Sequence, residues 1–100
     1  MLVVAIETDG AGAADLAEAA STQPSIEFDT REVEAQVGDP DTWMFVAQMA
    51  PTAITALSAT VIGLVRQRKI KYLKIGDVEI RDATPEQVAQ VLSTVDNRGP

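Results

Sequence analysis

The longest uncharged stretch of the chain constrains its fold more than any other feature. Residues 42–65 read TWMFVAQMAPTAITALSATVIGLV and contain no Asp, Glu, Lys or Arg. About 20 apolar residues are enough for a helix to cross a bilayer, and a helix that is apolar all round is buried in lipid or in protein. The sequence therefore predicts a helix from an N-cap at Asp39 to about Lys69, with a kink or a break at Pro51.

Two environments remain open for this helix. A membrane span over residues 43–65 is favoured by Trp43 at one end and by the basic run that follows the other end. A buried helix is favoured by the Gln, Thr and Ser residues inside the segment, and by predicted strands on both sides that need one another to form a sheet. The buried alternative predicts a seam for helix–helix contact. The seam residues are Ala50, Ile54, Leu57, Ala59, Val61, Gly63 and Leu64.

The N-terminal third predicts a strand, a helix and a second strand. Residues 2–8, LVVAIET, form a β-branched apolar run that is typical of a strand covered on both faces. Residues 11–21 are rich in Ala and predict a short helix, and a second strand begins near Ser25. The far end of that strand stays open, because Val33 and Val37 also fit a helical spacing. Such a unit most often forms a right-handed crossover between parallel strands.

A two-stranded hairpin is predicted within IKYLKIGDVEIRD, residues 70–82. Gly76 and Asp77 supply a two-residue turn, which fixes the register of the two strands. That register gathers the apolar residues on one face and leaves an opposite-charge pair and an aromatic–cation pair on the other. The predicted partners are Ile75 and Val78, Lys74 and Glu79, Leu73 and Ile80, and Tyr72 and Arg81.

A capped helix is predicted after the hairpin, in TPEQVAQVLSTV. Thr84 and Gln87 form a capping box around Pro85 at the first helical position. Residues 96–100 are predicted to be a frayed tail. One apolar stripe follows the helix, formed by Val88, Val91, Leu92 and Val95.

These elements predict one α+β domain over residues 1–100. The expected order is strand, helix, strand, helix, strand, strand, helix. The expected architecture is a small four-stranded mixed sheet with a long central hydrophobic helix, kinked or broken at Pro51, and a C-terminal helix.

The composition removes several kinds of chemistry. The chain has no Cys and no His, which excludes thiolate nucleophiles, Cys/His zinc sites and imidazole acid–base catalysis. DGAGAAD, residues 9–15, follows a strand and opens a helix, but it lacks the third glycine of a dinucleotide-binding fingerprint and is interpreted as a tight turn. No catalytic, cofactor-binding or metal-binding residue is predicted, and no cofactor is expected.

Charge is distributed unevenly along the chain. The net charge is −7, which argues against nucleic-acid binding, yet residues 66–74 hold five of the eight basic residues and no acid. This run is interpreted first as the cationic end of a helix, and second as a contact for phosphate or anionic lipid through Arg66, Arg68 and Lys69. No basic region or cleavage motif follows Met1, so a cytoplasmic location is expected, with the inner membrane as the alternative.

The succession PTAITALSATVIGLVRQRK, IKYLKIGDVEIRD and TPEQVAQVL resembles the effector-associated constant component family of bacterial conflict (defence) systems. The resemblance covers most of residues 1–95 and is strongest over residues 51–92. It implies a non-enzymatic adaptor that accompanies effector domains, and it supplies no catalytic residue. The uncharged helix with its small residues, together with the absence of catalytic groups, predicts that the chain self-associates or recruits an effector or regulator through the central helix. The alternative is a single-span membrane protein whose helix over residues 43–65 inserts and oligomerises as a membrane-directed effector.

Overall fold

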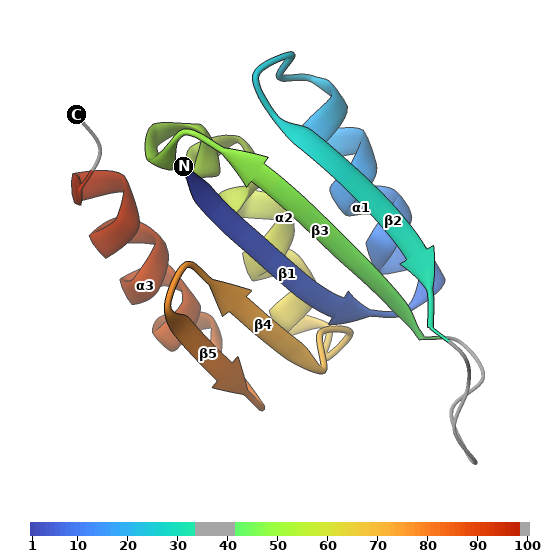
Figure 1. Cartoon of the computed structure of the whole chain (residues 1–100). Coiled ribbons are helices and arrows are strands. Elements are labelled where there is room, and N and C mark those ends of the chain that lie inside the picture. The colour runs from blue at the N-terminus through green and yellow to red at the C-terminus, as the bar shows by residue number, and fades with distance from the viewer. Residues whose placement is uncertain (34–41, 99–100) are drawn as a thin grey trace.

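A computed structural model of the chain describes residues 1–33 and 42–98 as a five-stranded sheet with its helices on one side (Figure 1). The strand order is β2-β3-β1-β4-β5, and every neighbouring pair is antiparallel. The elements are β1 (Leu2–Thr8), α1 (Gly10–Ser21), β2 (Glu27–Glu32), β3 (Trp43–Met49), a 3-10 turn η1 (Pro51–Ile54), α2 (Thr55–Arg66), β4 (Tyr72–Ile75), β5 (Val78–Arg81) and α3 (Pro85–Arg98).

The uncharged segment is not one long helix, so the predicted central helix over residues 43–65 is wrong. Its first part is strand β3, in which Phe45, Ala47 and Met49 are buried while Val46 and Gln48 are exposed. The backbone at Ala50 stays extended, and Pro51 then opens the 3-10 turn that leads into α2. The predicted N-cap at Asp39 lies outside the described residues. Across those residues, no helix is both long enough and apolar enough to span a bilayer.

The predicted four-stranded mixed sheet is also wrong, because β3 adds a fifth strand in an unexpected place. β3 pairs with β1 on one side and with β2 on the other, and it is antiparallel to both. Strands β1 and β2 therefore run in the same direction, as the crossover predicts, but β3 lies between them. Whether Val37 belongs to a strand or a helix lies outside the described residues, whereas the Val33 amide donates to the Thr42 carbonyl oxygen at 2.9 Å.

The hairpin has the predicted register at every pair, from Tyr72 with Arg81 to Ile75 with Val78. Gly76 has a φ of 60°, which suits the first central position of a type II′ turn. The Lys74 ammonium lies 4.0 Å from the Glu79 carboxylate, and the Arg81 guanidinium lies 5.3 Å from the centre of the Tyr72 ring. Both side-chain pairs predicted for the outer face of the hairpin are therefore confirmed.

The capping box of α3 is confirmed as well. The Gln87 amide donates to Thr84 Oγ1 at 3.2 Å, and the Thr84 amide donates to Gln87 Oε1 at 3.1 Å. Val88, Leu92 and Val95 are buried and Val91 packs against the core, so the predicted stripe faces inward. The helix continues through residues 96–98, which the sequence assigned to a frayed tail, while residues 99–100 lie outside the described part.

One hydrophobic core lies between the sheet and the three helices. Strands β1, β3 and β4 each contribute alternate side chains to it, and α1, α2 and α3 contribute their inward faces. The fully buried side chains with the largest volumes include Phe45, Ile6, Leu16, Met49, Ile54 and Leu57.

Candidate functional site

The face of the sheet opposite the helices is open. All three helices lie behind the sheet in Figure 1, and the strands in front of them carry alternately buried and accessible side chains. In β1, Val4 and Ile6 are fully buried, whereas Val3 is 44% exposed and Ala5 is half-buried. No described element covers the side chains on this face, so they are available to another molecule.

The strand register arranges the open face in three rows across the sheet. Partners on neighbouring strands stand directly opposite one another, so their side chains are neighbours on the face. The rows are Arg31, Met44, Glu7, Tyr72 and Arg81; Asp29, Val46, Ala5, Lys74 and Glu79; and Glu27, Gln48 and Val3.

Apolar side chains occupy the middle of the open face. Val3 and Val46 are 44% and 40% exposed, and the half-buried Ala5 lies opposite Val46 in the register. Met44 extends the apolar area toward the Arg31 end of β2. An exposed aliphatic cluster within a polar rim is the usual composition of a protein-binding surface.

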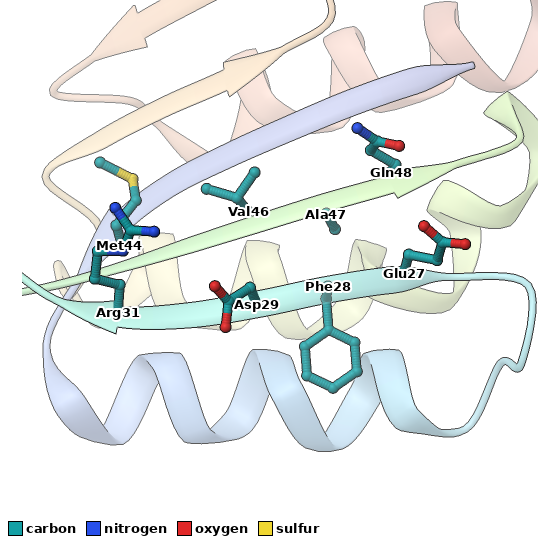
Figure 2. A pocket seen from close by; sticks show the side chains of 8 residues that line it. All are labelled: Glu27, Phe28, Asp29, Arg31, Met44, Val46, Ala47 and Gln48. Atoms are coloured by element: carbon teal, nitrogen blue, oxygen red, sulfur yellow. The ribbon is translucent and has the colours of Figure 1, made fainter.

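A shallow depression of about 430 Å³ lies on this face along β2 and β3. Figure 2 shows Met44, Val46 and Gln48 of β3 beside the charged side chains of β2, with Phe28 pointing away over α1. The Phe28 ring stacks on the buried ring of Phe45, with their centroids 5.8 Å apart, and this contact fastens β2 to the core. The lining residues are Glu27, Phe28, Asp29, Arg31, Met44, Val46, Ala47 and Gln48.

The two ends of the open face differ in charge. On the β2 side, Glu27 and Asp29 line the depression together with one base of the same strand, Arg31. On the β4–β5 side, Lys74 is paired with Glu79, and Arg81 lies over Tyr72. The pKa of the Tyr72 phenol is raised by loss of solvent around it, and further by the hydrogen bond and negative charge of Glu79, while Arg81 opposes the shift. With two carboxylates and one base, the lining of the depression carries a net negative charge.

The predicted helix seam is divided between the interior and the surface. Ile54, Leu57, Val61 and Leu64 are almost completely buried in the core of the same chain. Ala50 and Ala59 are exposed and Gly63 is half-buried, so only these three remain accessible to a partner. Ala59 and Gly63 line a groove of about 390 Å³ together with residues of α1. Helix α2, the part of the predicted central helix that is helical, is thus covered mainly by the sheet of its own chain.

The predicted basic residues lie where α2 ends. The Arg68 amide donates to the Val65 carbonyl oxygen and the Lys69 amide to that of Leu64, both at 3.0 Å, which is the hydrogen-bond pattern of a Schellman motif. Arg68 occupies the left-handed position of that motif with a φ of 58°, where glycine is the usual residue. The cationic helix end that the sequence predicts is present, and Arg66 lies in the last turn.

Replacing Arg68 with glycine is expected to stabilise the fold. A non-glycine residue in the left-handed region costs about 1 kcal/mol, and Arg68 is exposed and has no buried packing to lose. Arg68→Gly should therefore raise the free energy of unfolding by up to about 1 kcal/mol, measured by urea denaturation. Arg66→Gly is the matched control, because it places glycine inside the helix and should lower that free energy by about 1 kcal/mol. A loss of stability in both variants would contradict the assignment of Arg68 to the motif.

In the glycine-containing turn after β1, a backbone amide binds the carboxylate of Asp9. The Gly12 amide donates to Asp9 Oδ1 at 2.6 Å, so Asp9 is the N-cap of α1. A side-chain oxygen at the N-terminus of a helix occupies the place that a phosphate oxygen takes in nucleotide-binding turns. This turn before an Ala-rich helix agrees with the structural interpretation of residues 9–15.

Acidic side chains do not gather into a metal site in the part of the chain that the structure describes. No three Asp or Glu residues there are close enough to hold one ion. Ser21 and Ser58 donate to backbone carbonyl oxygens of Glu18 and Ile54, which is ordinary hydrogen bonding within a helix.

Sequence reasoning missed the open face because it assigned β3 to a helix. The signal was present in WMFVAQM, in which Phe45, Ala47 and Met49 alternate with Val46 and Gln48. That alternation was hidden because both faces of the strand lack charge.

No family model, curated protein sequence or solved structure matches this chain.

Proposed function

We propose that this chain is a non-enzymatic interaction module that binds a protein partner across the open face of its sheet. The observation that carries the proposal is the exposed aliphatic centre of that face, Val3, Ala5 and Val46, with no described element of the chain above it. Buried strands normally need cover on each apolar face, and a partner would supply it here.

The size of the face favours a transient partner. Five strands about 4.8 Å apart, each about six residues long at about 3.3 Å per residue, give roughly 500 Å² in projection. Stable interfaces bury about 800 Å² on each partner, so this face alone suits a weaker contact. Its mixed charge is also typical of complexes that form and dissociate.

The aliphatic and acidic side chains of the open face indicate what kind of partner surface would bind there. Aliphatic side chains of the partner would pack on Val3 and Val46, which lie in adjacent rows. A Lys or Arg of the partner would approach Glu27 and Asp29, which rim the depression. We therefore propose a protein surface with an apolar strip and a basic residue beside it.

The resemblance to the effector-associated constant component family supports an adaptor in a bacterial conflict system. In that role the chain recruits an effector or a regulator in the cytoplasm, and a second copy of itself is the alternative partner. The small residues of the uncharged segment predicted this contact on the central helix. The burial of Ile54, Leu57, Val61 and Leu64 within the chain leads us to propose the sheet face instead.

Val46→Arg is the variant that tests the proposal. Val46 lies opposite Asp29, so an arginine there gains an opposite charge beside it and keeps the fold while blocking the centre of the face. We expect at least about ten-fold weaker binding to the proteins encoded beside this gene, measured by biolayer interferometry, because a large charged side chain must be desolvated at the contact. Light scattering across a concentration series measures self-association in the same samples.

Ala59→Arg is the matched control, because Ala59 is exposed on α2, on the helix side of the sheet and away from its open face. It should leave binding unchanged if the sheet face is the contact. Loss of binding in Ala59→Arg alone would place the contact on the helix. A wild-type chain that remains monomeric and binds none of those proteins would contradict the proposal altogether.

A further inference from the structure

A second concave site lies away from the middle of the open face, where two chain connections meet. The connection from α2 to β4 supplies Arg68, Ile70 and Lys71, and the connection from β5 to α3 supplies Asp82 and Ala83. Together they line a half-open cavity of about 690 Å³, a size typical of small-molecule sites. We call it the basic cavity; its lining is Val65, Arg66, Arg68, Ile70, Lys71, Asp82, Ala83, Thr84 and Pro85.

The basic cavity is cationic in a chain that is otherwise acidic. Arg66, Arg68 and Lys71 line it against one carboxylate, that of Asp82, although the net charge of the chain is −7. Cations around a concave surface raise the local potential more than the same charges on a flat one, because low-dielectric walls focus the field. The cavity therefore attracts anions.

The two guanidinium groups are available to a ligand. Across residues 1–33 and 42–98, neither the Arg66 nor the Arg68 side chain has an ion pair or a hydrogen bond, and both are exposed. Lys71 differs, because its ammonium donates to Thr42 Oγ1 at 3.1 Å. We therefore assign the direct contacts to the two arginines and a longer-range electrostatic role to Lys71.

The backbone at Arg68 also distinguishes this site. The Schellman motif there accepts glycine without cost, yet an arginine occupies its left-handed position with a φ of 58°. Asp82, which also lines the cavity, has a positive φ as well, of 52°. Residues held in unfavourable backbone regions tend to cluster at ligand sites. A long cationic side chain at this position is consistent with a binding role.

The N-terminus of α3 borders the cavity but provides few free donors. The Gln87 amide already donates a hydrogen bond to Thr84 Oγ1, and the Val88 amide donates one to the Thr84 carbonyl oxygen. Side chains must therefore bind the anion, and the planar fork of arginine matches the oxygens of a phosphate group. Val65, Ile70 and Pro85 offer an apolar wall for the rest of such a ligand.

We infer that the basic cavity binds a phosphate group through Arg66 and Arg68. The phosphate belongs either to a soluble phosphate ester or to a lipid headgroup, which share this chemistry. The site uses none of the apolar residues at the centre of the open face, so it acts separately from the proposed partner contact.

The test is a titration of the chain with pyrophosphate, followed by amide NMR. We expect saturable shifts confined to residues 65–71 and 82–85, at constant ionic strength. Arg66→Gln and Arg68→Gln should each weaken binding about ten-fold, because each removes charged hydrogen bonds to the ligand. Arg68→Lys should bind with intermediate affinity, since it keeps the charge without the planar fork.

Arg31→Gln is the matched control, because Arg31 is an exposed arginine on the open face. Its binding should equal that of the wild type, and circular dichroism should show each variant to be folded. Equal shifts with sodium chloride of the same ionic strength, or unchanged binding in the Arg66→Gln/Arg68→Gln double variant, would overturn the inference.

Vesicle sedimentation separates the two sources of phosphate. If phosphatidylcholine vesicles containing phosphatidylglycerol sediment the wild type but not the double variant, and the pyrophosphate shifts are also present, the group is a lipid headgroup. If the pyrophosphate shifts occur without sedimentation, the ligand is a soluble ester. Sedimentation without a pyrophosphate response would contradict a phosphate site.

Discussion

Phe45→Ala is expected to lower the free energy of unfolding by about 3–5 kcal/mol, the usual cost of removing a buried aromatic ring. Phe45 is fully buried at the centre of β3 and stacks on Phe28. The substitution removes contacts with the core and with the ring that holds the edge strand β2. Urea denaturation followed by circular dichroism measures the change, and a small domain can lose half of its stability in this way.

Val46→Ala is the matched control for Phe45→Ala. The two residues are adjacent in sequence but point to opposite faces of β3, and Val46 is 40% exposed. We expect it to cost less than about 1 kcal/mol. Similar losses in the two variants would contradict the strand assignment, since successive side chains of a strand point to opposite faces of the sheet.

Gly12→Ala is expected to destabilise the chain by about 2–4 kcal/mol, through overpacking and the loss of a buried hydrogen bond. A methyl group at Gly12 would collide with Thr8 Oγ1 and lie 3.0 Å from Asp9 Oδ1. Thr8 is fully buried, and its hydroxyl donates to the Lys69 carbonyl oxygen at 3.0 Å. Moving Thr8 aside therefore breaks the hydrogen bond that ties the end of β1 to the connection after α2.

Gly63→Ala is the matched control, because Gly63 is also a helical glycine but nothing lies within 4 Å of its added methyl group. The substitution should raise the free energy of unfolding by about 0.5–1 kcal/mol, the difference in helix propensity between the two residues. Thermal denaturation of both variants should move the midpoints in opposite directions. Equal responses would show that crowding at Gly12 is not the cause.

The C-terminal third could be predicted from the sequence because its determinants are local. A two-residue turn at Gly76 and Asp77 allows one register for the hairpin, and the side-chain pairs agree with it. The cap of α3 depends on Thr84 and Gln87, three residues apart. Interactions over such short separations leave a clear pattern in the sequence.

Strand β3 was not predicted, because its two faces differ little in polarity: neither carries a charge, and Gln48 is the one polar side chain on the open face of the strand. Met44 and Val46 on the open face are apolar, as are Phe45 and Ala47 on the covered face. The strand then continues into an apolar helix after a single extended residue, Ala50. Without a charged face or a polar turn, strand and helix merge into one uncharged segment.

The position of β3 between β1 and β2 depends on contacts between distant residues. Local patterns predict that β1 and β2 run in the same direction, and the structure agrees. They contain no information on whether a third strand enters between them. The open face, which carries the proposed function, exists only once that strand is in place, so assigning the segment to a helix also hid the candidate site.

The placement of β1 at the centre of the sheet has a consequence for synthesis of the chain. This first strand pairs with β3 on one side and with β4 on the other, through Leu2 with Met49 and Val4 with Ile75. Its second edge stays unpaired until residue 75 has emerged from the ribosome, and unpaired apolar strands invite aggregation. We expect slow, late folding dominated by long-range pairing, in which the most buried strand is made first and completed last.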